Sequence, residues 1–233
     1  MNFFTNGATV VLAHGAWADG SSWSKVILPL VQAGLRVVCA PLPLTSWRDD
    51  VGVVEGIVDE ARGPVILVGH AYGGAVISGV LSDKVKSLVF VAALAPDEGE
   101  TVADVFYRDE KHHDSPALAP DAKGFIWMPD KGFAMAVSHL ASAEENVVGA
   151  AVQRPISVHC IQEKVGRPAW RNTPSWYLLA EEDRMINPVT QRFMAERMGA
   201  QVRSHAVDHS PAITSANTVV DVILEAANAT ATV

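Results

Sequence analysis

Two glycines flank a notable position at residues 69–73, where the sequence reads Gly-His-Ala-Tyr-Gly. The pattern Gly-x-nucleophile-x-Gly is typical of a sharp turn between a strand and a helix that presents a nucleophile. Glycine is favoured at both flanks because the neighbouring chain approaches closely there. In this chain the nucleophile position holds Ala71, whose methyl group can neither attack a carbonyl nor give up a proton. The pattern therefore predicts a site for covalent catalysis that lacks its attacking atom.

An acid and a histidine follow this turn in the chain order that a nucleophile–acid–histidine triad requires. Asp183 comes after one late predicted strand and His209 after the last one. We expect Asp183 to hold the imidazole of His209 in the productive tautomer and to stabilise its cation. Glu181 and Glu182 are rival acids, although they lie nearer the strand end, and Asp97 is a weaker alternative.

The segment His14-Gly15-Ala16-Trp17 follows the first predicted strand. A loop at this place donates one backbone N–H to an oxyanion hole in sites of this kind, and the residue after the nucleophile donates the other. The sequence therefore assigns the amides of Ala16 and Tyr72 to the oxyanion hole. An ordinary strand-to-helix loop is the alternative.

Aromatic residues near these motifs suggest the walls of a substrate pocket. We expect His14, Trp17 and Trp127 to contact the substrate, and six tryptophans in the chain favour an apolar or aromatic ligand. No metal or other cofactor is expected. The adjacent His112 and His113 lack the helical His-x-x-x-His spacing of a metal site and are predicted to be exposed.

Two further residues are predicted to have no part in the chemistry. Asp208 is poorly placed to bond the ring of the next residue, and we expect it to be solvated. Cys39 lies in an apolar strand and is predicted to be a small buried hydrophobe.

Composition excludes several classes of function. The 233 residues carry a net charge of −8 with no block of Lys or Arg, which argues against nucleic acid or an anionic membrane as partner. No stretch approaches eighteen apolar residues, so no membrane span is expected. The N-terminus, residues 1–7, has no signal-peptide pattern, and two cysteines form no disulfide framework. The expected compartment is the cytoplasm.

Short apolar runs alternate with helical patterns, which indicates an α/β protein with a mostly parallel central sheet flanked by helices. Predicted strands cover residues 8–13, 35–40, 64–68, 85–94, 174–180 and 201–207. Predicted helices cover residues 21–34, 46–61, 73–81, 188–198 and 211–227, with a fraying tail at 228–233. This alternation of strands and helices is lost over residues 97–171. The sequence therefore predicts a single domain of core residues 1–96 and 172–233, with a mainly helical cap inserted at about 97–171.

The motifs together resemble those of the small α/β-hydrolases of the esterase, plant methylesterase and hydroxynitrile-lyase group. The likeness is greatest to bacterial members whose turn reads Gly-His-Ser-Tyr-Gly-Gly, and it extends over residues 14–17, 69–74, 95–100 and 174–186. The resemblance implies an α/β-hydrolase fold and cofactor-free hydrolysis of carboxylic esters in a pocket between core and cap. This chain departs from it at Ala71.

Three hypotheses account for Ala71. The favoured one is a serine esterase, acting on a small apolar or aromatic ester or lactone, whose nucleophile has been replaced by alanine. The second is a natural enzyme without a nucleophile, a lyase or cofactor-free oxygenase in which His209 and Asp183 act as the base. The third is a ligand-binding protein without turnover.

Overall fold

The computed structural model describes residues 7–230. Six strands form one parallel sheet in the order β2-β1-β3-β4-β7-β8. The strands are β1 (Thr9–Ala13), β2 (Arg36–Ala40), β3 (Val65–His70), β4 (Val85–Val91), β7 (Ser175–Ala180) and β8 (Gln201–His205). β1, β3 and β7 are mostly apolar and are buried along their whole length, because helices cover both faces of the sheet. The predicted class, a mostly parallel sheet flanked by helices, is confirmed.

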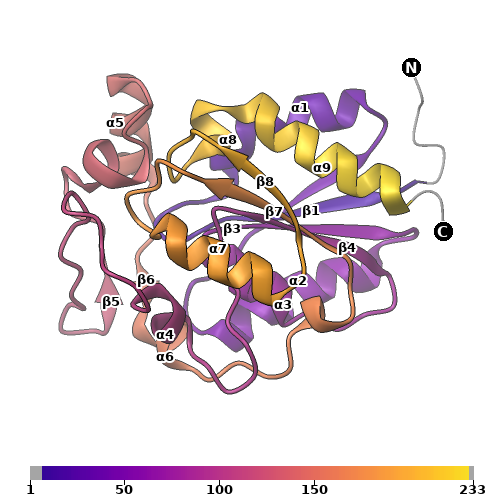
Figure 1. Cartoon of the computed structure of the whole chain (residues 1–233), viewed down its shortest axis with the longest axis horizontal. Coiled ribbons are helices and arrows are strands. Elements are labelled where there is room, and N and C mark those ends of the chain that lie inside the picture. Colours follow the sequence, from indigo (N-terminus) through magenta and orange to yellow (C-terminus); the bar gives the residue numbers. More distant parts are fainter. Residues whose placement is uncertain (1–6, 231–233) are drawn as a thin grey trace.

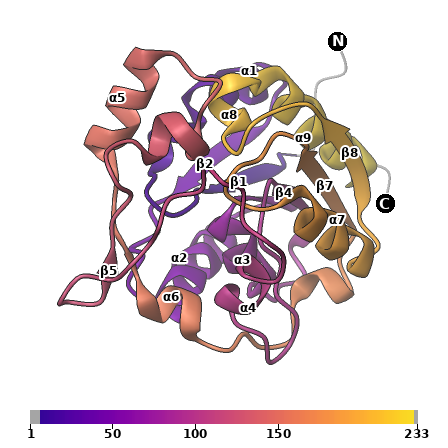
Figure 2. The same ribbon diagram turned by 60° about the vertical axis from the view of Figure 1, so that its left-hand side comes forward.

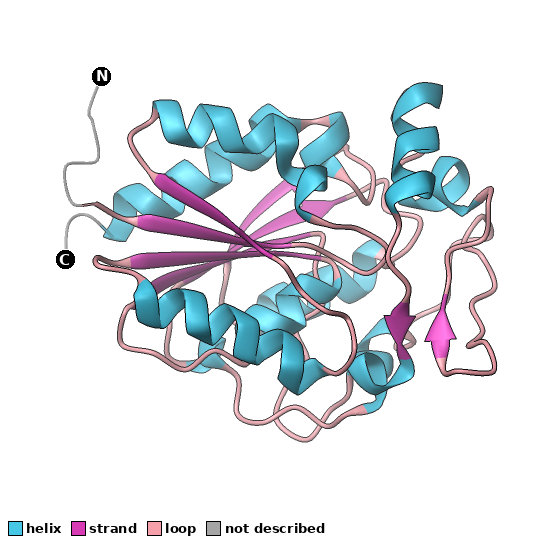
Figure 3. Cartoon of the chain, turned by 180° about the vertical axis from the view of Figure 1, so that it is seen from behind, coloured by secondary structure: helices cyan, strands magenta, loops and turns pink. Residues whose placement is uncertain are grey.

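Helices pack on the sheet in two layers (Figure 1). One layer holds α1 (Ser24–Gln32), α8 (Pro211–Thr214) and α9 (Ala216–Thr230), and the other holds α2 (Trp47–Glu60), α3 (Tyr72–Ser78) and α7 (Pro188–Arg197). Two apolar clusters fill the space between these helices and the sheet, one on each face. Figure 3 shows the same three layers from behind.

Between β4 and β7 the chain leaves the sheet and forms short elements, most of which lie beyond one end of the sheet (Figure 2). They are α4 (Val102–Phe106), β5 (Phe125–Ile126), a π-helical segment (Phe133–Val137), α5 (Ala143–Val152), β6 (Ile156–Ser157), α6 (Val158–Gln162) and a 3-10 turn (Ala169–Arg171). β5 and β6 pair in an antiparallel ribbon. We refer to residues 97–171 as the inserted segment.

Several local expectations need correction. The helix predicted to begin at Ser21 begins as a 3-10 turn (Gly20–Trp23) capped by Asp19, and α1 follows it. The closing helix is divided at Ser215 into α8 and α9, and residues 228–230, expected to fray, belong to α9. Cys39 is only partly buried rather than a core residue.

Some expectations fall outside the described residues. Residues 231–233 of the predicted tail do so, as do residues 1–6, on which the signal-peptide prediction rests. Within residues 7–230, no helix has the length and apolar character needed to cross a bilayer.

Candidate active site

Ala71 stands at the turn between β3 and α3, in a backbone conformation that side-chain-bearing residues rarely adopt. Its φ of 49° and ψ of −119° place it in a strained region that costs about 1–3 kcal/mol. The surrounding chain holds it there, since its carbonyl accepts from the amides of Leu94 (2.9 Å) and Gly74 (3.1 Å). The turn therefore presents the Cβ of position 71 at the carboxyl end of the sheet.

The flanking glycines are required by contact with neighbouring backbone. A Cβ atom on Gly69 would lie 2.5 Å from the carbonyl oxygen of Gly73, and one on Gly73 would lie 2.4 Å from that of Ala13. Neither backbone oxygen can move aside without displacing a strand or helix. The sharp turn of the sequence pattern thus depends on glycine at both positions.

Asp183 and His209 form a buried hydrogen-bonded pair. The Nδ1 of His209 donates to Oδ2 of Asp183 over 2.8 Å, and both side chains are almost completely buried. Because an ionised carboxylate only accepts hydrogen bonds, the Nδ1 carries the proton and Nε2 is left as a basic lone pair.

The remaining lone pairs of Asp183 are also satisfied. Its Oδ1 accepts from the amides of Met185 (2.7 Å) and Ile186 (2.9 Å), and its Oδ2 accepts from Nε2 of Gln191 (2.8 Å). Such a network fixes the carboxylate in one orientation, and with it the ring of His209. Of the rival acids, Glu181 is bound by Arg192 and Ser204, and Asp97 is bound by Arg171.

His70, inside the turn motif, is hydrogen-bonded to the backbone of His209. Its Nε2 donates to the backbone carbonyl of His209 over 2.6 Å, and the two rings are 4.9 Å apart between centroids. Burial, with a smaller contribution from the neighbouring His209, lowers the pKa of His70 to about 3. His70 is therefore an uncharged structural donor at neutral pH.

The two amides expected at the oxyanion hole are free of local partners. Tyr72 is the first residue of α3, so its N–H has no carbonyl within the helix to bond. The amide of Ala16 has no hydrogen-bond partner among residues 7–230. Both residues line the same cavity as Ala71 and His209.

Two neighbouring pockets share three lining residues, and we refer to them as the inner and outer compartments of the site. The inner compartment, of about 70 Å³, contains Ala71, Tyr72 and a wall of apolar side chains that includes Leu94, Phe106 and Ile161. The outer compartment, of about 280 Å³, lies between α5 and the segment around η1 and α8, where η1 is the 3-10 turn at Gly20–Trp23. Ala16, Trp17 and His209 line both compartments.

Two residues expected to contact the substrate lie elsewhere. His14 is fully buried, with its Nδ1 2.9 Å from the carbonyl oxygen of Gly15, and it lines neither compartment. Burial lowers its pKa. Trp127 is 51% exposed and is likewise absent from both linings. Of the three residues expected to contact the substrate, only Trp17 lines the cavity.

Asp208 is fully buried, contrary to the expectation that it is solvated. Its Oδ1 accepts from the Ser210 amide and the Thr214 hydroxyl, and its Oδ2 accepts from the Leu140 amide over 3.0 Å. It therefore fixes the loop that carries His209 and attaches that loop to the inserted segment. As anticipated, it makes no bond to the neighbouring ring.

Asp50 is a buried residue that sequence reasoning missed. It lies in the first turn of α2, where the helix dipole favours a carboxylate and water could satisfy its oxygens. Instead its Oδ2 accepts from the phenol of Tyr72 over 2.6 Å and contacts Sγ of Cys160 on α6 at 3.6 Å, while its Oδ1 accepts from the Leu44 amide. Burial raises the pKa of Asp50 and that of the Tyr72 phenol, and it raises the pKa of Cys160 to about 12.

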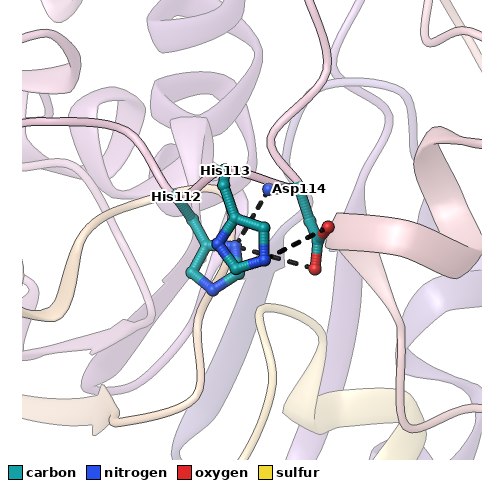
Figure 4. A group of neighbouring side chains, drawn as sticks. All are labelled: His112, His113 and Asp114. Carbon is teal, nitrogen blue, oxygen red and sulfur yellow. Dashed lines mark hydrogen bonds and ion pairs between the residues drawn. The ribbon is translucent and has the colours of Figure 1, made fainter.

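His112, His113 and Asp114 form a cluster on the surface of the inserted segment (Figure 4). Their possible ligand atoms lie within 4.8 Å of one another. Two of these groups already have protein partners, because Asp114 pairs with Arg184 at 3.0 Å and Nδ1 of His112 accepts from the Asp114 amide. Asp114 and one ring nitrogen of His112 are therefore engaged by the protein itself.

The model of the family described as "Alpha/beta hydrolase family" matches residues 10–222. The chain belongs to the alpha/beta hydrolase family. The match covers all six strands of the sheet, except for the first residue of β1. It also includes all the elements that carry the site.

Two curated relatives confirm the resemblance to the esterase and methylesterase group. A carbendazim-hydrolyzing esterase of Nocardioides sp. (strain SG-4G) is 35% identical over an alignment of 113 residues, which covers 41% of this chain and 46% of that protein. The chain thus matches less than half the length of that relative. A putative chloroplastic methylesterase 14 of Arabidopsis thaliana is 24% identical over 93% of this chain and 71% of that protein.

Among solved structures, the T18A mutant of tomato methylketone synthase I shares the fold. It is 19% identical, with a TM-score of 0.83, and the superposition covers 96% of this chain and 98% of that one. At this identity the likeness concerns the fold alone.

Proposed function

We propose that this chain carries the acyl-transfer site of a serine carboxylesterase in which Ala71 replaces the nucleophile. In this proposal Asp183 is the acid, His209 the base, and the amides of Ala16 and Tyr72 form the oxyanion hole. The substrate is a small ester or lactone with an apolar or aromatic part. No cofactor takes part.

One observation carries the proposal: His209, buried and hydrogen-bonded to Asp183, lines the same cavity as Ala71, whose backbone is strained. With alanine at position 71, the strained conformation brings no benefit in packing. With a longer side chain, the same turn would direct that side chain into the cavity beside His209. Without a hydroxyl, a comparable hydrolase retains roughly 10³–10⁴-fold catalysis over water from its oxyanion hole and binding alone.

With a hydroxyl at position 71, the expected chemistry has two steps. The hydroxyl oxygen attacks the carbonyl carbon while Nε2 of His209 takes its proton and returns it to the departing alcohol. Water then attacks the acyl carbon and gives a proton to the same nitrogen. That nitrogen returns the proton to the oxygen of position 71 as the acyl–oxygen bond breaks, and the carboxylic acid leaves. The two amides stabilise the negative oxygen in both steps.

The experiment is hydrolysis of p-nitrophenyl acetate by the A71S variant. We expect its kcat/KM to exceed that of the unaltered chain by at least a hundredfold, and to fall back to that level in A71S/H209A. A folded A71S variant without activity on acetate, butyrate and benzoate esters would overturn the proposal.

The intact Asp183–His209 pair also supports a second candidate, in which His209 abstracts a proton from a bound substrate and no nucleophile is needed. The deciding result would be an activity of the unaltered chain that is lost in His209→Ala and is not increased by A71S. Ligand binding indifferent to both Asp183→Asn and His209→Ala would instead favour a binding protein.

A further inference from the structure

Trp17 stands where the two compartments of the cavity meet. It is one of three residues that line both of them, and of the three it has the largest side chain. The compartments differ in character as well as size. The lining of the inner one is almost wholly apolar, whereas the outer one combines apolar residues with polar and charged side chains, including Ser22, Lys25 and Glu144.

The position of Trp17 is constrained both at its backbone and at its ring nitrogen. Its backbone has a φ of 58°, in the left-handed region that bulky residues rarely occupy. Its Nε1–H donates to the carbonyl of Ile126 in β5 over 2.9 Å, which links the loop after β1 to the inserted segment. A strained backbone and a directional bond together favour a single position of the ring.

The positions of the reacting groups assign the two halves of an ester. Ala71 and Tyr72, the sites of attack and of one oxyanion donor, line only the inner compartment, while His209 lines both. The acyl group stays bound to position 71 after the first step, so it must lie in the inner compartment. The alcohol takes its proton from His209 and leaves on the other side of that ring.

We propose that Trp17 divides the site into an inner acyl compartment and an outer alcohol compartment, and so sets substrate choice. The substrate class is then an ester of a short apolar acid with a larger alcohol that bears polar groups. This inference rests on the proposed function, because it needs acyl transfer at position 71.

The acyl side is tested with p-nitrophenyl acetate and p-nitrophenyl octanoate in the A71S background. We expect A71S to prefer acetate, and A71S/W17A to raise the octanoate-to-acetate ratio of kcat/KM at least tenfold by joining the compartments. A71S/W17F keeps a ring but loses the bond to Ile126, and should retain the preference for acetate. A71S/W127A removes an exposed tryptophan outside the cavity and serves as the matched control, with an unchanged ratio.

The alcohol side is tested with ethyl butyrate and glyceryl monobutyrate, which share an acyl group. We expect A71S to favour the glyceryl ester at least fivefold. Gly149 lines the outer compartment, and its substitution in A71S/G149W should lower the glyceryl-to-ethyl ratio at least tenfold by filling that space.

The two proposals fail in different ways. If A71S is folded but inactive on every ester, the proposed function is wrong. If A71S is active but W17A leaves the acyl ratio unchanged, or G149W leaves the alcohol ratio unchanged, the division by Trp17 is wrong while the esterase site stands.

Discussion

The phenol of Tyr72 donates a 2.6 Å hydrogen bond to the fully buried carboxylate of Asp50. Tyr72 is the residue after Ala71, and its amide is the proposed oxyanion donor. The bond therefore attaches the first turn of α3 to α2. The same carboxylate oxygen of Asp50 also contacts Sγ of Cys160 in α6. Ile161, the next residue of α6, lines the inner compartment.

Breaking this bond should impair turnover more than substrate binding. In the A71S background we expect Asp50→Asn and Tyr72→Phe each to lower kcat about tenfold with KM within twofold. This is less than the 10²–10³ loss on removing an oxyanion donor outright, because the amide is shifted and not deleted. Since the two residues act through one bond, the double variant should be no worse than the poorer single one. Steady-state kinetics on p-nitrophenyl acetate measure both constants; a rise in KM alone would contradict this positioning.

The acid of the proposed triad is tested by Asp183→Asn in A71S. The amide cannot hold His209 in the required tautomer, and we expect kcat to fall about 10⁴-fold. Glu182, an exposed rival that immediately precedes Asp183 in the chain, supplies the matched control. Equal losses in A71S/E182Q and A71S/D183N would show that the acid has been misassigned.

Burial of His70 makes folding depend on pH. Its pKa of about 3 in the folded protein lies below the value of about 6.5 in an unfolded chain. As the pH falls from 6.5 toward 3, the unfolded state takes up a proton that the folded state does not, so stability is present above 6.5 and is lost below it. The upper limit is about 1.4 kcal/mol per pH unit from this group.

Urea unfolding at pH 7 and pH 4.5 of the unaltered chain and of His70→Gln measures that contribution. Glutamine keeps a donor for the carbonyl of His209 but does not titrate. We expect the loss of unfolding free energy between the two pH values to be smaller in the variant. Parallel losses would contradict the inference that His70 stays neutral when folded.

The glycines of the turn can be tested through stability alone. Gly73→Ala places a Cβ against the backbone of Ala13 and His14, and we expect it to destabilise the protein by about 1–3 kcal/mol or more. Gly56, on the exposed side of α2 with no atom within 4 Å of where a Cβ would lie, is the control. Gly56→Ala should stabilise by up to about 1 kcal/mol, because alanine favours helix. Thermal melting curves of the two variants that shift in the same direction would contradict the close approach.

The sequence predicted the sheet, its flanking helices and the chain order of the site because strand runs, glycine spacing and triad order are local or topological signals. It did not predict the burial of Asp50, since a carboxylate in the first turn of a helix carries the same signal whether water or a phenol faces it. Asp208 was misjudged because one of its partners, the Leu140 amide, comes from the inserted segment, 68 residues away in the chain. Trp127 lines neither compartment. The inserted segment lacks regular periodicity, so nothing in its sequence indicates which side chains face the cavity.

The central claim is that only the attacking atom is missing from an otherwise complete acyl-transfer site, and covalent labelling tests it most directly. The A71S variant is incubated with a p-nitrophenyl alkylphosphonate, and intact-protein and peptide mass spectrometry locate any adduct. We predict one phosphonyl group per chain on the peptide that contains position 71, at least a hundredfold slower labelling in A71S/H209A, and none at this position in the unaltered chain. A folded A71S variant that is not labelled, or is labelled equally fast without His209, would contradict the account.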